Sequence, residues 1–197
     1  MLYEVRMTIH KLDYLTINRD QLERESAICD YVPINRVTLR RLKMDKSNSS
    51  YGSKFSDYLD SEDKEWWLRQ DTWQSSINAD EDLLRFMPEA SRILIMFKGV
   101  LETDNIEANF FSQQKDTTVK THIDVGTPCA INFIIRGNKT PIVFEDSGEH
   151  YYQNALLDVS KRHSVPKQID DDRLVFKLRI LDVSFEEAQN KIIKFFE

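Results

Sequence analysis

The second half of the chain is built from short apolar runs separated by turn-forming residues. Gly126-Thr127-Pro128, Gly137-Asn138 and Asp146-Ser147-Gly148 are among these separators. Apolar runs of this length, bounded by such residues, predict β-strands. Strands are expected at 93–98, 108–112, 119–124, 130–135, 142–145, 155–159 and 174–181. Many short strands at regular spacing are typical of a β-sandwich or a β-barrel.

The first half of the chain carries signals for a few supporting elements. Residues 1–12 alternate loosely between apolar and polar side chains and suit a first strand. Asn18 is a suitable cap for a helix that begins just after it. Residues 80–86 predict a second short helix that stops near Pro88.

The C-terminal segment predicts a helix with one apolar face. Ser184 followed by Glu187 matches the capping-box pattern of a helix start. Apolar residues then recur at helical spacing, at Phe185, Ala188, Ile192, Ile193 and Phe196. We interpret this stripe as a packing face. A contact between two copies of the chain, in a homodimer, is the alternative.

Three stretches of the first half have side chains that a function can use. Residues 36–46 are rich in arginine and lysine, which indicates a solvated face or, alternatively, a contact with an anion or a substrate backbone. Residues 46–56 are the most loop-like part of the chain and are a candidate lid over a site. Trp66, Trp67 and Trp73 stand in a helix-permitting context, and we interpret them as packing residues.

Length and composition are those of an ordinary folded domain. The 197 residues predict a single domain over 1–197, with 1–92 as N-terminal support, 93–183 as the β core and 184–197 as a C-terminal helix. No run of 18 apolar residues occurs, so no membrane span is expected. Two cysteines, far apart, do not suggest a disulfide framework or a zinc site and indicate a reducing, cytoplasmic setting. The net charge of −6 argues against broad affinity for nucleic acid.

Candidate chemistry centres on His122 and Asp124, two positions apart in a segment with extended character. Side chains at i and i+2 of a strand share a face and lie about 6.5 Å apart, so the two can lean onto one ion. His163 offers a second imidazole, and His150 is its rival for this role. Two neutral imidazoles and one carboxylate form the triad that binds non-haem iron(II) with coordination positions left open.

Arg173 begins an apolar strand ten residues after His163. A fold-back centred near Gln168 is expected to set His163 and Arg173 opposite each other on neighbouring strands. An arginine near the ion can clamp a dicarboxylate through paired, charge-assisted hydrogen bonds. Asn132, flanked by apolar residues, is expected to be buried and to contact either a cosubstrate or a core hydrogen-bond partner.

The ordered set His122-x-Asp124, His163 and Arg173 resembles the signature of the iron(II)/2-oxoglutarate-dependent dioxygenases, over about residues 107–181. The resemblance implies a double-stranded β-helix, a jelly roll with helices packed on one outer sheet. It implies that His122, Asp124 and His163 bind Fe(II) and that Arg173 binds the distal carboxylate of 2-oxoglutarate. It also implies that O2 and 2-oxoglutarate are consumed while a protein side chain, an amino acid or another small molecule is hydroxylated.

Two other functions stay open. Arg173 and Arg179 resemble the tail motif of the AlkB-type nucleic-acid demethylases. The upstream Asn-x-Tyr element of that family is matched only partly, and at an offset position, by Asn109-Phe110-Phe111. The acidic charge balance also speaks against this branch, and we do not expect a nucleic-acid partner. The other alternative is a non-catalytic, cupin-like binding protein in which His122 and His163 are incidental.

Overall fold

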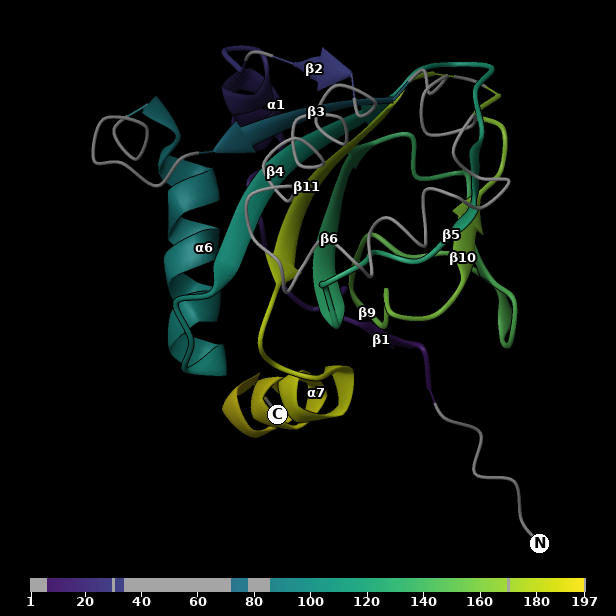
Figure 1. Ribbon diagram of the computed structural model, residues 1–197. Helices are drawn as coiled ribbons and strands as arrows, with labels where there is room; N and C mark the ends of the chain where they lie inside the picture. Colours follow the sequence, from purple (N-terminus) through teal and green to yellow (C-terminus); the bar gives the residue numbers. More distant parts are fainter. Residues whose placement is uncertain (1–6, 30, 34–71, 78–85, 170, 197) are drawn as a thin grey trace, which may run out of the picture.

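Two antiparallel sheets and three helices make up the described part of the chain. The computed structural model describes residues 7–29, 31–33, 72–77, 86–169 and 171–196. The helices of this part are α1 (Arg19–Ser26), α6 (Pro88–Leu101) and α7 (Phe185–Phe196). The strands are β1 (Ile9–Lys11), β2 (Val32–Pro33), β3 (Thr72–Ile77), β4 (Ile106–Gln113), β5 (Val119–His122), β6 (Cys129–Arg136), β7 (Ile142–Phe144), β8 (Gly148–His150), β9 (Asn154–Leu157), β10 (His163–Val165) and β11 (Arg173–Ile180). The larger sheet has the order β1-β9-β6-β11-β4-β3-β2, and the smaller sheet has the order β5-β10-β7-β8 (Figure 1).

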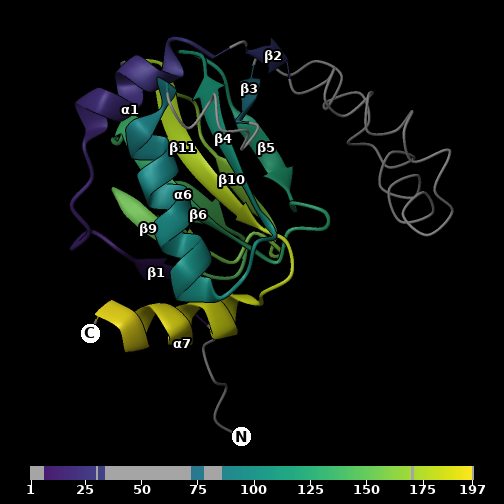
Figure 2. The same ribbon diagram turned by 90° about the vertical axis from the view of Figure 1, so that its left-hand side faces the viewer.

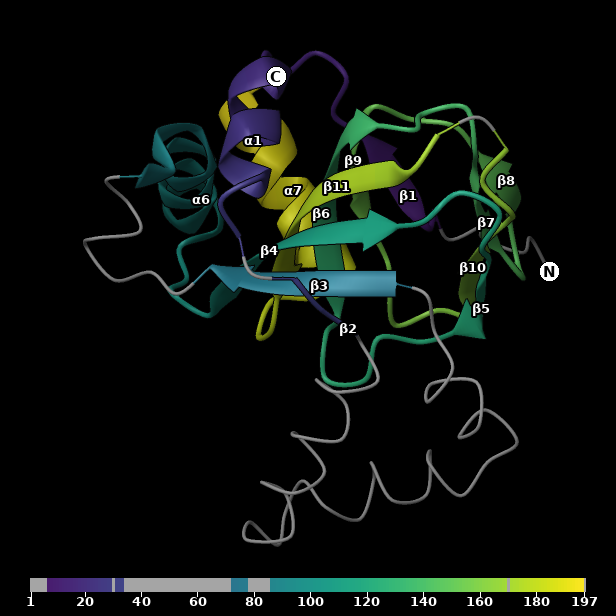
Figure 3. The ribbon, with the colours of Figure 1, turned by 90° about the horizontal axis from the view of Figure 1, so that it is seen from above.

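The chain alternates between the two sheets as it runs from β4 to β11. Strands β4, β6, β9 and β11 belong to the larger sheet, whereas β5, β7, β8 and β10 belong to the smaller one. Seen from above, the smaller sheet lies on one side of the larger sheet and the helices lie on the other (Figure 3). This alternation is the double-stranded β-helix, or jelly roll. The predicted fold class, mainly β with flanking helices, is confirmed.

Strand β11 is apolar along its length because both of its faces are covered. Phe176, Leu178 and Ile180 pack into the core cluster that the larger sheet shares with the helices. Val175 points the other way, into a second cluster between the two sheets. Since side chains alternate along a strand, Arg173 and Lys177 also face the space between the sheets. Polar residues at these two positions therefore lie inside the jelly roll.

Helices α1 and α6 lie over the outer face of the larger sheet, and α7 crosses at its lower end (Figure 2). Both predicted helix caps form: the Asn18 side chain accepts a hydrogen bond from the backbone N–H of Gln21, and Ser184 Oγ accepts one from that of Glu187. The apolar stripe of α7 packs inward, since Phe185, Ala188 and Ile192 are buried in the same cluster as the sheet. The stripe is thus a packing face, as predicted.

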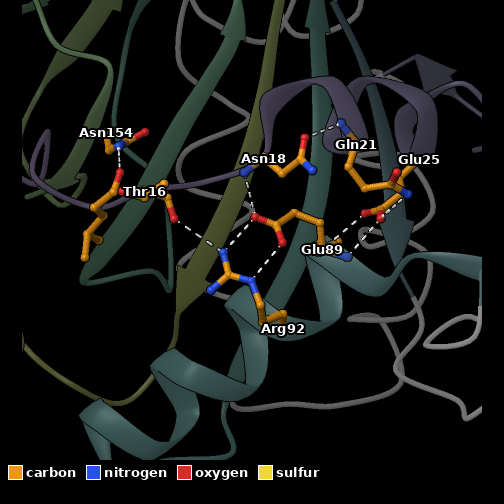
Figure 4. Close-up of polar contacts among 9 residues, drawn as sticks. Thr16, Asn18, Gln21, Glu25, Glu89, Arg92 and Asn154 are labelled. Atoms are coloured by element: carbon orange, nitrogen blue, oxygen red, sulfur yellow. Dashed lines mark hydrogen bonds and ion pairs between the residues drawn. The ribbon is translucent and has the colours of Figure 1, made fainter.

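Buried carboxylates join α1 to the start of α6 (Figure 4). Glu25 accepts hydrogen bonds from the backbone N–H groups of Glu89 and Ala90, each at 2.9 Å. These groups lie in the first turn of α6, where a helix provides no partner of its own. Glu89 in turn accepts bonds from the backbone N–H of Asn18 at 2.8 Å and from Arg92 at 2.7 Å. The junction fixes the position of α6 over the sheet.

The prediction of a strand at 93–98 is wrong, because these residues lie within α6. The apolar run at 93–98 is nearly continuous because α6 packs against the sheet, α1 and α7 at once. The buried positions have helical spacing, at Ile93, Leu94, Phe97, Val100 and Leu101, whereas Ile95 is 61% exposed. Pro88 begins this helix, since a proline in the first turn lacks only an N–H that would have no helical partner. Phe86, the described end of the helix predicted at 80–86, is helical.

Other first-half predictions are met in part or lie outside the described residues. Of the first predicted strand, at 1–12, the structure describes residues 7–12, and Ile9–Lys11 of these form β1. Trp73 lies in a strand, β3, and not in a helix. The basic segment 36–46, the candidate lid 46–56, Trp66, Trp67 and residues 80–85 lie outside the described residues. Within the described ranges, none of the helices has the length and apolar character needed to cross a membrane.

Candidate metal centre

His122 and His163 face each other across two paired strands of the smaller sheet. His122 is the last residue of β5 and His163 is the first of β10, and the antiparallel ladder pairs one directly with the other. Their ring centroids are 4.4 Å apart. Both side chains are buried, and the ring of Phe144, from the neighbouring strand β7, packs 5.6 Å from that of His163. The register of three short strands therefore brings two imidazoles together in an apolar setting.

A backbone carbonyl holds each imidazole by the same nitrogen. The Nδ1 of His122 lies 2.7 Å from the carbonyl oxygen of Lys120, and the Nδ1 of His163 lies 2.8 Å from that of Lys161. A carbonyl oxygen only accepts hydrogen bonds, so each Nδ1 carries a proton, and in the neutral form of each ring the lone pair lies on Nε2. In metal sites, a hydrogen bond at the ring nitrogen that does not bind the metal orients the histidine ligand.

Asp124 lies two residues after the end of β5 and completes the cluster. Its backbone N–H donates to the carbonyl of Val159 at 2.9 Å, and its own carbonyl accepts from Thr127 at 3.0 Å, which fixes the turn. Its Oδ1 lies 3.4 Å from the Nε2 of His122. One ligand atom each of His122, Asp124 and His163 lies within 4.8 Å of the others, and no further group of this kind occurs in the described ranges of the chain.

The electrostatic surroundings favour the protonation states that a metal requires. Burial raises the pKa of Asp124, but the charge of Lys177 beside it and the contact with His122 outweigh the effect of burial and hold the pKa well below its usual range. Burial and the neighbouring His122 lower the pKa of His163 to about 4, against the opposing effect of Asp124. Near neutral pH the cluster therefore offers a carboxylate and a neutral imidazole.

A lysine, Lys177, forms an ion pair with this cluster. Its Nζ lies 2.5 Å from Oδ2 of Asp124, the oxygen that does not point toward His122. Lys177 comes from β11 in the larger sheet, so the ion pair crosses the interior of the jelly roll. Sequence reasoning missed this residue. Its signal was its spacing from Arg173, because residues four apart on one strand share a face.

A second polar group lies deeper in the interior, around Arg173. This residue is 3% exposed, and its Nη2 donates to the hydroxyl of Tyr152 at 3.2 Å. The side-chain amide of Asn132 donates to the same hydroxyl at 3.0 Å. Tyr152 was also missed, because it stands in a loop between two predicted strands. Asn132 is partly buried, and Tyr152 is the core hydrogen-bond partner that was one of the two contacts expected for it.

Several polar atoms of this deeper group have no hydrogen-bond partner among the described residues. They are Arg173 Nε, Asn132 Oδ1 and Gln113 Oε1. Gln113 is paired directly with Arg173 in the sheet, so two of the three atoms come from adjacent positions. No carboxylate of the described ranges forms an ion pair with Arg173. Because buried polar groups are normally satisfied, this region is suited to a polar, anionic ligand.

The expected pairing of His163 with Arg173 is wrong. His163 lies in the smaller sheet, where its partners are His122 and Phe144, whereas Arg173 lies in the larger sheet opposite Gln113. The segment between them crosses from one sheet to the other instead of folding back as a hairpin. Both side chains nevertheless face the same interior.

His150, the rival of His163, and Arg179, from the AlkB-type motif, both have partners outside the cluster. His150 lies on β8, and its Nε2 is 2.9 Å from the hydroxyl of Ser147, outside the cluster. Arg179 pairs with Glu107 at 2.6 Å and donates to Thr127 at 2.5 Å. Lys177, and not Arg179, is the cation in contact with Asp124.

Comparison with known proteins gives distant structural likenesses. No family model matches the sequence, and no curated protein matches it either. A solved structure of an oxidoreductase of the 2OG-Fe(II) oxygenase family from Burkholderia pseudomallei is similar, with 11% identity, a TM-score of 0.46, and coverage of 82% of this chain and 76% of that one. The viral collagen prolyl hydroxylase of Paramecium Bursaria Chlorella virus-1, solved with 2OG, has 7% identity, a TM-score of 0.39 and coverage of 56% and 78%. A cupin superfamily protein from Desulfitobacterium hafniense has 15% identity, a TM-score of 0.33 and coverage of 41% and 71%.

Proposed function

We propose that this protein is an Fe(II)- and 2-oxoglutarate-dependent dioxygenase that hydroxylates a protein side chain, an amino acid or another small molecule. One observation carries the proposal. His122 and His163 are both held through Nδ1 by backbone carbonyls, which directs their Nε2 lone pairs, with Asp124, toward one point.

The donor set fits iron(II). Two neutral nitrogen ligands and one carboxylate oxygen on a single side of the ion leave positions open for a cosubstrate and for O2. His122, Asp124 and His163 would hold the metal. The carbonyls of Lys120 and Lys161 would keep the two imidazoles in the tautomer that binds it.

The interior around Arg173 fits the distal carboxylate of 2-oxoglutarate. A buried guanidinium without an anionic partner is costly, and a planar carboxylate matches its paired donors. The hydroxyl of Tyr152 already accepts bonds from Arg173 and Asn132, so its own hydrogen is left to donate to the same ligand. We assign Arg173, with Tyr152 and Asn132 beside it, to the cosubstrate.

The overall reaction then converts a substrate C–H bond, O2 and 2-oxoglutarate into the hydroxylated product, succinate and carbon dioxide. When bound, the iron supplies the activation of O2. The chain's own residues position the cosubstrate and exclude water. Val175, Ile134 and Phe144 belong to the apolar cluster between the two sheets, and their side chains exclude water from the interior.

Anaerobic titration with Fe(II) and then 2-oxoglutarate tests the proposal. We expect a weak visible charge-transfer band in the wild-type protein and its loss in His122→Ala and Asp124→Ala. The matched control is His150→Ala, which removes an imidazole outside the cluster and should keep the band. If the wild-type protein gives neither the band nor succinate formation under air, the dioxygenase assignment fails and a non-catalytic, cupin-like binding role is favoured.

A further inference from the structure

Lys177 contacts the candidate metal centre from the opposite sheet. It lies on β11, and its neighbours in register on the two flanking strands are Asn109 and Asn132, which carry no charge. Asp124 is the one carboxylate within the described ranges that forms an ion pair with it. A cation placed beside a divalent metal site weakens metal binding by repulsion, so this lysine requires an explanation beyond holding the metal.

Exposure to solvent differs between the two polar groups of the interior. Arg173 and Tyr152 are 3% and 5% exposed, whereas the side chains of Lys177 and Asp124 are 18% and 14% exposed. Solvent therefore reaches the candidate metal centre from the Lys177 side and does not reach the proposed cosubstrate pocket around Arg173. A molecule that enters from solvent meets Lys177 next to the metal.

The charges of the loaded site do not balance without one more anion. A divalent ion, Lys177 and Arg173 outweigh Asp124 and the doubly charged 2-oxoglutarate by one positive charge. Once Asp124 shares its charge with the metal, its pairing with Lys177 weakens. Partly buried charges are stabilised by a partner of opposite sign, and a monoanion is the partner that restores neutrality.

We propose that Lys177 binds a carboxylate of the primary substrate, so that the substrate is a small carboxylic acid oriented by this lysine beside the metal. The inference rests on the proposed function, because it assumes that metal and 2-oxoglutarate occupy the site. A carboxylate carries one negative charge, whereas a phosphate monoester carries nearly two and would overcompensate.

The test uses the full chain loaded with Co(II), which reports changes at the metal through its visible spectrum, and saturated with 2-oxoglutarate. Acetate is the minimal probe, and acetamide at the same ionic strength is the neutral control. Wild-type protein should respond to acetate saturably and not to acetamide. Lys177→Met, which keeps most of the chain length and removes the charge, should weaken the acetate response at least about tenfold. Lys177→Arg should retain most of it.

The outcomes separate this inference from the function on which it rests. If Co(II) or 2-oxoglutarate does not bind the wild-type protein, the proposed function fails and the inference fails with it. If both bind but acetate has no saturable effect, or acetamide acts equally well, the assignment of Lys177 is overturned and the dioxygenase proposal stands. An acetate response that Lys177→Met leaves unchanged places the anion on the metal itself and also overturns it.

Discussion

Gly137 packs directly on the backbone of Arg173. A Cβ atom at Gly137 would lie 2.8 Å from the Cα of Arg173 and 3.0 Å from its Cβ, and Gly137 has a φ of +78°. Both the contact and the backbone angle require glycine. The turn after β6 therefore fixes the backbone position of Arg173, the arginine that we assign to the cosubstrate.

Gly137→Ala should weaken 2-oxoglutarate binding more than it weakens metal binding. The added methyl group has to displace the Arg173 backbone, and small misplacements at such a site cost about tenfold or more. Gly148→Ala is the matched control, because Gly148 has a φ of +79° and open space around its Cβ position. The positive φ alone should cost both variants about 1–2 kcal/mol in the free energy of unfolding, measured in urea, and Gly137→Ala should lose more because of its contact with Arg173. Equal 2-oxoglutarate affinities in the two variants, measured by titration calorimetry with Mn(II), would contradict the positioning role.

Lys177→Met should bind divalent metal about tenfold more tightly than the wild-type protein. The substitution removes an ammonium that lies 2.5 Å from Asp124 Oδ2, and with it both a competitor for that carboxylate and a charge that repels the incoming ion. Lys177→Arg keeps the charge and should resemble the wild type. Anaerobic competition with a chromophoric chelator measures the difference. Tighter metal binding together with weaker acetate binding separates a role in substrate recognition from a general loss of structure, which would weaken both.

Glu25→Ala should destabilise the fold by about 3 kcal/mol. Glu25 is 1% exposed and accepts hydrogen bonds from two N–H groups in the first turn of α6, and buried donors left without partners cost about 1–3 kcal/mol each. The control is Asp104→Ala, which removes the Lys98 ion pair at a side chain that is 95% exposed and should cost less than about 1 kcal/mol. Urea unfolding followed by far-UV circular dichroism gives both values. Similar losses in the two variants would argue against the junction described for α1 and α6.

Only Cys29 should react with a thiol reagent in the native protein. Cys129 is fully buried, and burial, with the nearby charges of Asp158, Glu186 and Glu187, raises the pKa of its thiol to about 12. Since the thiolate is the reactive form, Cys129 should react only after denaturation. Ellman's reagent should therefore titrate one thiol in buffer and two in guanidinium chloride. Rapid reaction of two thiols in the native protein would contradict the burial of β6.

The apolar runs at β4, β6 and β11, and the helix caps at Asn18 and Ser184, could be predicted from sequence because each depends on residues close together in the chain. The segment 93–98 could not, since an apolar run of six residues has no period that separates a buried strand from a helix packed on several sides. Strand β8 was missed because it has only three residues and little apolar character.

The residues of the candidate site could be predicted from the sequence, but their arrangement in space could not. His122 and Asp124 are local neighbours, so their shared direction follows from strand geometry. The placement of His163 beside His122 depends on which strands pair. Arg173 is only ten residues after His163, which suggested a hairpin, but the chain changes sheets between the two residues. Lys177 was overlooked because a lysine in a strand usually indicates an edge or a solvated face, and β11 is central.

The central claim is that His122, Asp124 and His163 hold one divalent metal ion. Anaerobic equilibrium dialysis against Fe(II), compared among the wild type, His122→Ala, His163→Ala and His150→Ala, measures it most directly. We predict one bound equivalent in the wild type and in His150→Ala, and affinity at least about a hundredfold weaker in the other two variants. Wild-type protein that binds no iron, or His122→Ala and His163→Ala variants that bind it as well as His150→Ala does, would contradict the claim.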